Sequence, residues 1–116
     1  MPSRLQKEVV AALVMLDETT EVQEEVRTAS GYSLDAVVTF RGLKFGIEVD
    51  GPSHFVGRSR VPTASTSLKR RQLVALEELC VLSVPYWVWG DKSKGECRDY
   101  LQRELTRALG AFKIIK

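Results

Sequence analysis

Hydrophobic and polar residues alternate most regularly over two neighbouring stretches of the chain, residues 34–40 and 43–50. The apolar positions are Leu34, Ala36, Val38 and Phe40 in the first stretch and Leu43, Phe45, Ile47 and Val49 in the second. A period of two is that of a strand with one buried face. If Arg41 and Gly42 form a tight turn that pairs Phe40 with Leu43, all eight apolar side chains share one face, so the pattern predicts an antiparallel hairpin.

The remaining pattern predicts three helices and two further strands. Helical spacing of apolar residues covers residues 3–16, with Ser3 as a candidate N-cap, about 66–79, and from about Gly95 or Glu96 to Leu109, with Gly110 as a stop. The glutamate-rich residues 21–28 predict an edge strand, and the apolar run 80–84 predicts a buried strand that Pro85 ends. The order α-β-β-β-α-β-α predicts an α/β domain with a mixed sheet flanked by helices.

Composition narrows the class of protein. The 116 residues suffice for one compact core, so we expect a single domain over 1–116. With 44% hydrophobic and 28% charged residues the chain is not a disordered tail, and two cysteines do not make a disulfide scaffold. One histidine and two distant cysteines are too few ligands for a structural zinc site. The longest apolar run, residues 9–16, is far short of the ~18 residues of a bilayer span, so no membrane partner is expected.

The hairpin register has a chemical consequence on its polar face. It sets Asp35 directly across from Glu48, and Asp50 lies two residues further along the same face. Carboxylates packed together repel unless a cation or a shared proton compensates. Because oxygen ligands with open positions suit Mg²⁺ or Mn²⁺, this cluster is a candidate metal site; the alternative is a solvated polar sheet face.

The net charge of +2 hides a strongly basic segment, residues 51–71, which contains no acidic residue. Its cations are Arg58, Arg60, Lys69, Arg70 and Arg71. Serines and threonines leading into a basic helix start are typical of a phosphate-binding surface, because backbone N–H groups, the helix dipole and cationic side chains converge there. The alternative is a solvated basic loop.

Two further features have both a functional and a structural interpretation. His54 follows Asp50 by four residues and could act on a phosphate or a water molecule, or it could order the loop through hydrogen bonds. Trp87 and Trp89 could stack on unpaired bases or belong to the core, and strand alternation would place both on the same side.

Three ordered motifs resemble the RAP domain, over about residues 32–105. They are residues 46–55 (GIEVDGPSHF), 68–73 (LKRRQL) and 81–87 (VLSVPYW). RAP domains typically follow RNA-binding helical repeats in organellar RNA-processing proteins. The family is similar to the PD-(D/E)xK fold of restriction endonucleases, in its very-short-patch-repair branch, which agrees with the predicted element order.

The resemblance also implies roles for individual residues. Asp35 would be the first acid of the nuclease motif and Glu48 the second, whereas the lysine position two residues later holds Asp50. Either Asp50 is a further metal ligand and Lys69 supplies the cation, or the site binds without hydrolysing. Val88 is a second departure, because many members have an acid between the two tryptophans.

The first hypothesis is an RNA-binding module with a nuclease-like fold that acts in organellar RNA processing or stability. Single-stranded RNA would contact His54, Arg58, Arg60, Arg70, Arg71 and Trp87. The alternatives are an active Mg²⁺-dependent or Mn²⁺-dependent endoribonuclease, with Asp35, Glu48, Asp50 and Lys69 as catalytic residues, and a docking domain for a helical-repeat region or a ribonucleoprotein. The resemblance implies a mitochondrial location, with a chloroplast or other plastid as the alternative.

Overall fold

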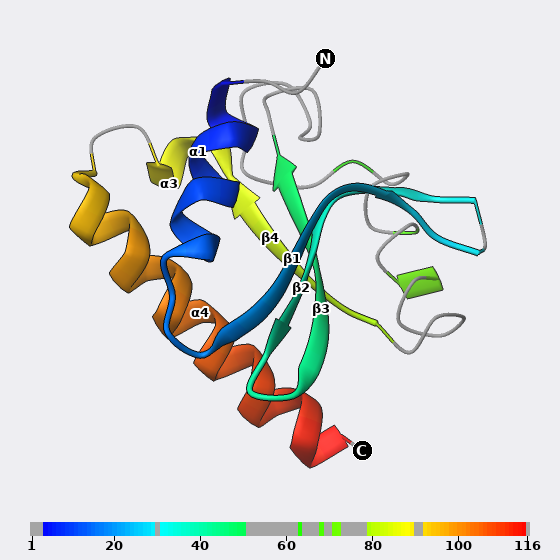
Figure 1. Cartoon of the computed structure of the whole chain (residues 1–116). Helices are drawn as coiled ribbons and strands as arrows, with labels where there is room; N and C mark the ends of the chain where they lie inside the picture. Colours follow the sequence, from blue (N-terminus) through cyan, green and yellow to red (C-terminus); the bar gives the residue numbers. More distant parts are fainter. Residues whose placement is uncertain are drawn as a thin grey trace.

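The structure, a computed structural model, describes residues 4–29, 31–50, 63, 68, 71, 72, 79–89 and 92–115. Its helices and strands follow in the order α1 (Arg4–Val14), β1 (Thr19–Arg27), β2 (Ser33–Phe40), β3 (Leu43–Asp50), β4 (Cys80–Pro85), α3 (Tyr86–Trp89) and α4 (Lys94–Ile115) (Figure 1). The predicted α/β class is confirmed. Most of the helix predicted over 66–79 lies outside the described residues; Leu68, Arg71 and Gln72 within it are helical.

The four strands form one mixed sheet in the order β1-β2-β3-β4. The first three are antiparallel neighbours, whereas β3 and β4 run parallel, so their carboxyl ends lie at the same end of the sheet (Figure 1). β1 is the edge strand that the sequence predicts. The sequence predicts that β4 is a buried strand, and its burial is less complete than predicted. Among the described strands β4 pairs only with β3, and most of its residues are half-buried.

The β2–β3 hairpin has the predicted register, with Phe40 opposite Leu43, Val38 opposite Phe45 and Ala36 opposite Ile47. Its turn residues have positive φ angles, 50° at Arg41 and 82° at Gly42. This is the left-handed backbone that matches the twist of a two-residue hairpin, and glycine adopts it without a steric penalty. The turn therefore fixes which face of each strand is buried.

One member of the predicted apolar face is displaced. Leu34 does not join the main core but packs with Leu79 in a second cluster on the other face of the sheet. The recorded β2–β3 pairing stops at Ala36, and Gly46 leaves room beside it, since a Cβ on Gly46 would lie 3.1 Å from Leu34 Cδ1. Opposite this part of β2, Glu25 of β1 has a positive φ of 51°. The prediction from alternating hydrophobic residues assumes regular strand geometry, which does not extend beyond Ala36 to Leu34.

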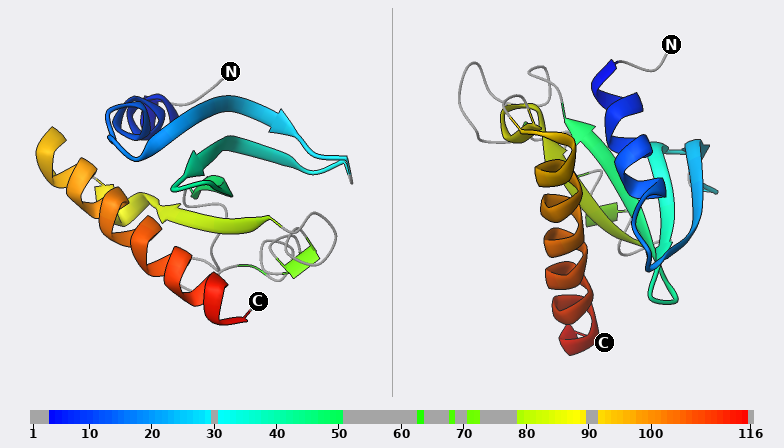
Figure 2. Two further views of the ribbon diagram at one scale, coloured as in Figure 1. Left: turned by 60° about the horizontal axis from the view of Figure 1, so that its bottom comes forward. Right: turned by 60° about the vertical axis from the view of Figure 1, so that its left-hand side comes forward.

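The main core lies between the sheet and two helices on one of its faces. α1 and α4 lie side by side against that face (Figure 2). Their fully buried residues are Val9 and Leu13 of α1 and Leu101 and Leu105 of α4. They meet Phe40 and Phe45, whose rings pack edge to face with centroids 6.5 Å apart. Each such side chain contributes about 1.5–3 kcal/mol by leaving water, so both helices are integral to the fold.

The C-terminal helices differ from the sequence prediction in two ways. α4 continues through Gly110 to Ile115, because a glycine that is not followed by other stop signals costs only about 1 kcal/mol inside a helix. Tyr86–Trp89 form a short helix, α3, so the strand alternation that would place Trp87 and Trp89 on the same side does not apply. None of the helices in the described part of the chain is long and apolar enough to cross a bilayer.

Candidate functional site

Two buried carboxylates lie at the carboxyl end of β3. Glu48 stands opposite Ser83 in the parallel β3–β4 pair, and Asp50 stands opposite Pro85. Glu48 is 6% exposed and Asp50 is 1% exposed. Phe45 and Ile47 of β3 point into the core that α1 and α4 cover. Because side chains alternate along a strand, Glu48 and Asp50 both lie on the other face of the sheet. An open α/β sheet commonly places its ligands at this end of its parallel strands.

Asp50 is held by a side chain from the neighbouring strand. The Ser83 hydroxyl donates a hydrogen bond to Asp50 Oδ2 and so joins β3 to β4 beyond the backbone ladder. Burying a carboxylate is unfavourable unless hydrogen bonds or charges replace its water. Ser83 is therefore part of the site, and the sequence prediction missed it. Its signal was available, because Ser83 is the one polar residue in the apolar run 80–84.

Asp35, the third predicted carboxylate, has a different partner. The backbone N–H of Val49 donates to Asp35 Oδ2 at 2.7 Å, so this side chain takes the place of a ladder carbonyl where the recorded β2–β3 pairing has stopped. Asp35 also lines a hollow of about 340 Å³ with Gln6 of α1 and Glu25 of β1. The predicted Asp35–Glu48 pair is therefore absent from the recorded ladder.

The three predicted carboxylates can be compared with what a metal site requires. Within the described part of the chain, no three His, Cys, Asp or Glu side chains are grouped so that they could hold a metal ion. Mg²⁺ is usually bound through one or two carboxylates together with waters or phosphates. Glu48 and Asp50 are the two members of the predicted set that lie on one strand and one face, and a Mg²⁺ or Mn²⁺ site built on them stays a prediction.

Most of the predicted cationic partners cannot be placed. His54, Arg58, Arg60, Lys69 and Arg70 lie outside the described residues. Arg71 is exposed and helical, and it belongs to the connection between the parallel strands β3 and β4. The backbone of Trp87 lies in α3, directly after the end of β4.

The two cysteines are not activated nucleophiles. Burial raises the pKa of the Cys80 thiol, and it is also the main reason for the raised pKa of Cys97. A thiol with a raised pKa stays protonated at neutral pH and reacts slowly. Both side chains pack in or against the main hydrophobic core.

These observations define a class of protein: an α/β domain with a mixed sheet and two buried acids at the end of a parallel strand. A basic segment without acidic residues follows that strand in the sequence. The profile of the RAP domain family matches residues 47–104, half of the chain. The chain belongs to the RAP domain family. The matched segment begins in β3 and ends in α4, so it contains Glu48, Asp50, the whole basic segment and Ser83, whereas Asp35 precedes it.

A curated relative supports the same family. A chloroplastic RAP domain-containing protein of Oryza sativa subsp. japonica is 36% identical to this chain over 108 residues, which are 90% of this chain and 16% of the rice protein. The chain thus spans about a sixth of the length of that relative. No solved structure matches the chain. RAP domains usually bind RNA and act in organellar RNA processing.

Proposed function

We propose that this chain is an RNA-binding module that acts in organellar RNA processing, without hydrolysing RNA itself. The observation that carries the proposal is that the family match contains the complete basic segment 51–71, which follows directly on the buried carboxylates of β3. Five cations and no acid attract a phosphate backbone, and Arg71, the described member, is exposed. A plastid location, the alternative in the sequence analysis, is supported by the chloroplastic rice relative, which lends no support to the mitochondrial location that was the first expectation.

The test is the salt dependence of RNA binding. We expect a labelled single-stranded RNA to bind the 116-residue chain with a log–log slope of about −0.7 for each phosphate contacted. Charge reversal of two cations, Arg70→Glu with Arg71→Glu, removes contacts and makes the slope shallower. The matched control is the double change Arg103→Glu with Arg107→Glu on α4, at two exposed cations outside the basic segment. An affinity that does not change with salt, or one that falls equally in the control, would contradict this function.

A second candidate, a metal-dependent endoribonuclease, is favoured by one observation: Glu48 and Asp50 are both buried, two residues apart, on one face of β3. In this case cleavage of the same RNA requires Mg²⁺ or Mn²⁺, with His54 or Lys69 stabilising phosphate charge, and it disappears in Glu48→Gln. Binding without metal-dependent cleavage supports the module alone. Cleavage that persists in Glu48→Gln and in Asp35→Asn would not come from these carboxylates.

A further inference from the structure

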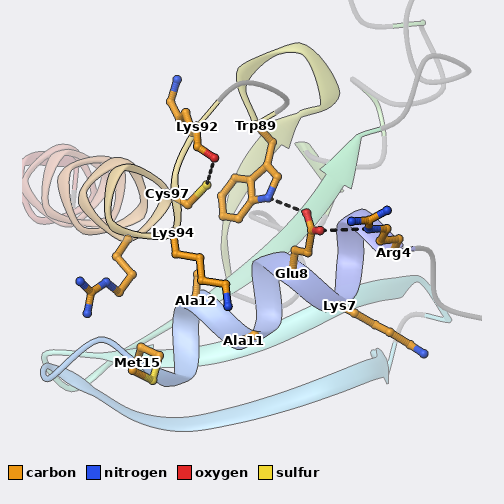
Figure 3. Close-up of a pocket in the computed structure, with 11 residues that line it drawn as sticks. Arg4, Lys7, Glu8, Ala11, Ala12, Met15, Trp89, Lys92, Lys94 and Cys97 are labelled. Atoms are coloured by element: carbon orange, nitrogen blue, oxygen red, sulfur yellow. Dashed lines mark hydrogen bonds and ion pairs between the residues drawn. The ribbon is translucent and has the colours of Figure 1, made fainter.

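A groove of about 910 Å³ lies on the helical side of the molecule, away from the basic segment in sequence. It runs between α1 and the beginning of α4, and α3 contributes Trp89 (Figure 3). The lining residues of α1, together with Met15 directly after it, recur at intervals of three and four, so the groove follows one face of α1 along its length. At 1.5 Å per residue, this length of helix is about 16 Å, or three turns.

The groove is apolar inside. Ala12, Trp89 and Cys97 are buried there, and Ala11 and Met15 stand on the α1 side. The side chain of Met15 is 62% exposed, and that of its neighbour Val14 is 61% exposed. Large apolar side chains so far exposed, beside an apolar groove, are typical of a surface that a partner covers.

The edges of the groove are cationic. Among the described residues, the charged ones in the lining are Arg4, Lys7, Lys92, Lys94 and Arg98, against the acid Glu8. Glu8 is already engaged, because it accepts hydrogen bonds from Arg4 Nε at 3.2 Å and from Trp89 Nε1 at 3.1 Å (Figure 3). The occupant of this groove must therefore bring negative charge as well as an apolar side.

Nucleic acid fits this surface less well than a protein segment does. Unpaired bases bind by stacking on the open face of an aromatic ring, but Trp89, the only aromatic residue among the described residues of the lining, is 6% exposed. The exposed apolar residues are instead aliphatic, Ala11 and Met15, which suit aliphatic side chains in a helix-in-groove contact.

We propose that this groove binds an acidic amphipathic helix of a partner protein. Apolar side chains at helical spacing would lie on Met15, Ala11 and the buried floor, while carboxylates on the flanks would pair with Lys94 and Arg98 of α4 and with Arg4 and Lys7 of α1. This docking activity is separate from the RNA binding proposed above, because it uses neither the basic segment nor the β3 carboxylates.

The probe is a synthetic peptide of about 15 residues, somewhat longer than the groove, with leucines at i, i+3, i+4 and i+7 and glutamates at most other positions. Fluorescence anisotropy of the labelled peptide measures its Kd for the whole 116-residue chain. The comparison peptide has the same composition in a scrambled order, so it keeps the charge and loses the apolar side. We expect the amphipathic peptide to bind at least about tenfold more tightly than the scrambled one.

Variants of the chain locate the contact. Met15→Asp, at an exposed position, and the double change Lys94→Glu with Arg98→Glu should each raise the Kd of the peptide about tenfold or more. The double change Arg103→Glu with Arg107→Glu makes the same charge change on exposed residues of α4 outside the groove, and it should leave the Kd within about twofold. Circular dichroism melts verify that the variants are folded.

Three results would overturn the proposal. Equal binding of the scrambled peptide would show attraction by net charge alone, and no binding of either peptide at ~1 mM would show that the groove takes no such helix. The third is loss of single-stranded RNA binding in Met15→Asp with no effect on the peptide, which would make the groove a nucleic-acid surface. Failure of the RNA-binding proposal leaves the two peptide readouts unchanged, so the docking proposal can be tested without it.

Discussion

Asp50 is the most deeply buried carboxylate in the described part of the chain, at 1% exposure, and its contact with Ser83 joins the two parallel strands. We expect Ser83→Ala to lower the free energy of unfolding by about 1–3 kcal/mol, because a buried acceptor loses its donor. Urea unfolding measures the change. Ser83→Thr keeps the hydroxyl and should recover much of the stability.

A double-mutant cycle separates the contact from the rest of the environment. If the hydroxyl–carboxylate contact is stabilising, Ser83→Ala in an Asp50→Asn background should be less costly than in the natural chain. Additive effects of the two substitutions would contradict an interaction between these side chains. The cycle also shows how far the site at the end of β3 is structural in the absence of any ligand.

At the scale of the element, the start of α4 is fixed by a reciprocal capping pair. The Ser93 hydroxyl accepts a hydrogen bond from the Glu96 N–H at 3.2 Å, and Glu96 Oε1 accepts one from the Ser93 N–H at 3.1 Å. The latter contact lowers the pKa of the Glu96 carboxyl below its ordinary value of 4.5. The stability due to this pair is therefore present above pH 4.5 and is lost as the pH falls through the lowered pKa.

The expected outcome is a difference in pH profile. Glu96→Gln should lose stability at neutral pH and show a flatter decline of the free energy of unfolding below pH 4.5 than the natural chain. Chemical unfolding at a series of pH values measures both profiles. Glu104→Gln, in the middle of the same helix, is the control, and identical profiles for Glu96→Gln and the natural chain would show that the capping pair contributes nothing.

How far the sequence predicts these elements depends on where the determining contacts lie. The hairpin was predictable to the residue between Ala36 and Ile47, because alternation and the Arg41-Gly42 turn are local signals that agree with each other. The position of Leu34 on the other face of the sheet was not predictable, because it depends on contacts with Gly46 and Leu79, which are distant in sequence. The Ser93–Glu96 pair was a local signal that the predicted start at Gly95 or Glu96 overlooked.

The site shows the same division between local and distant determinants. Glu48 and Asp50 share one face at the end of β3, as strand alternation predicts, whereas the contact between Asp35 and the Val49 N–H depends on the path of β2 beyond Ala36. The cationic groove was invisible in the sequence, because its lining comes from α1, α3 and α4 and is assembled only by packing.

At the scale of the whole molecule, the family-matched segment is only part of the folding unit. Residues 47–104 omit α1, β1 and β2, which supply four fully buried core residues: Val9, Leu13, Val38 and Phe40. At about 1.5–3 kcal/mol each, their loss is comparable to the total stability of a small domain, about 5–15 kcal/mol. We expect the fragment 47–104 to show no cooperative thermal transition, in contrast to the whole chain.

Calorimetry and near-UV circular dichroism make this comparison. A cooperative melt of the fragment would contradict the view that the N-terminal elements complete the core. The intermediate fragment 32–104 restores β2 but lacks α1, so it should remain unfolded if α1 is needed to cover the sheet.

The glutamates of β1 have a consequence for the protein in concentrated solution. Glu21, Glu24 and Glu25 are exposed along the outer edge of the sheet, and the left-handed backbone of Glu25 interrupts its regular outline. A second copy that tried to extend the sheet at this edge would bring like charges together and meet an irregular row of backbone groups. The edge strand β1 therefore disfavours extension of the sheet by a second copy at this edge.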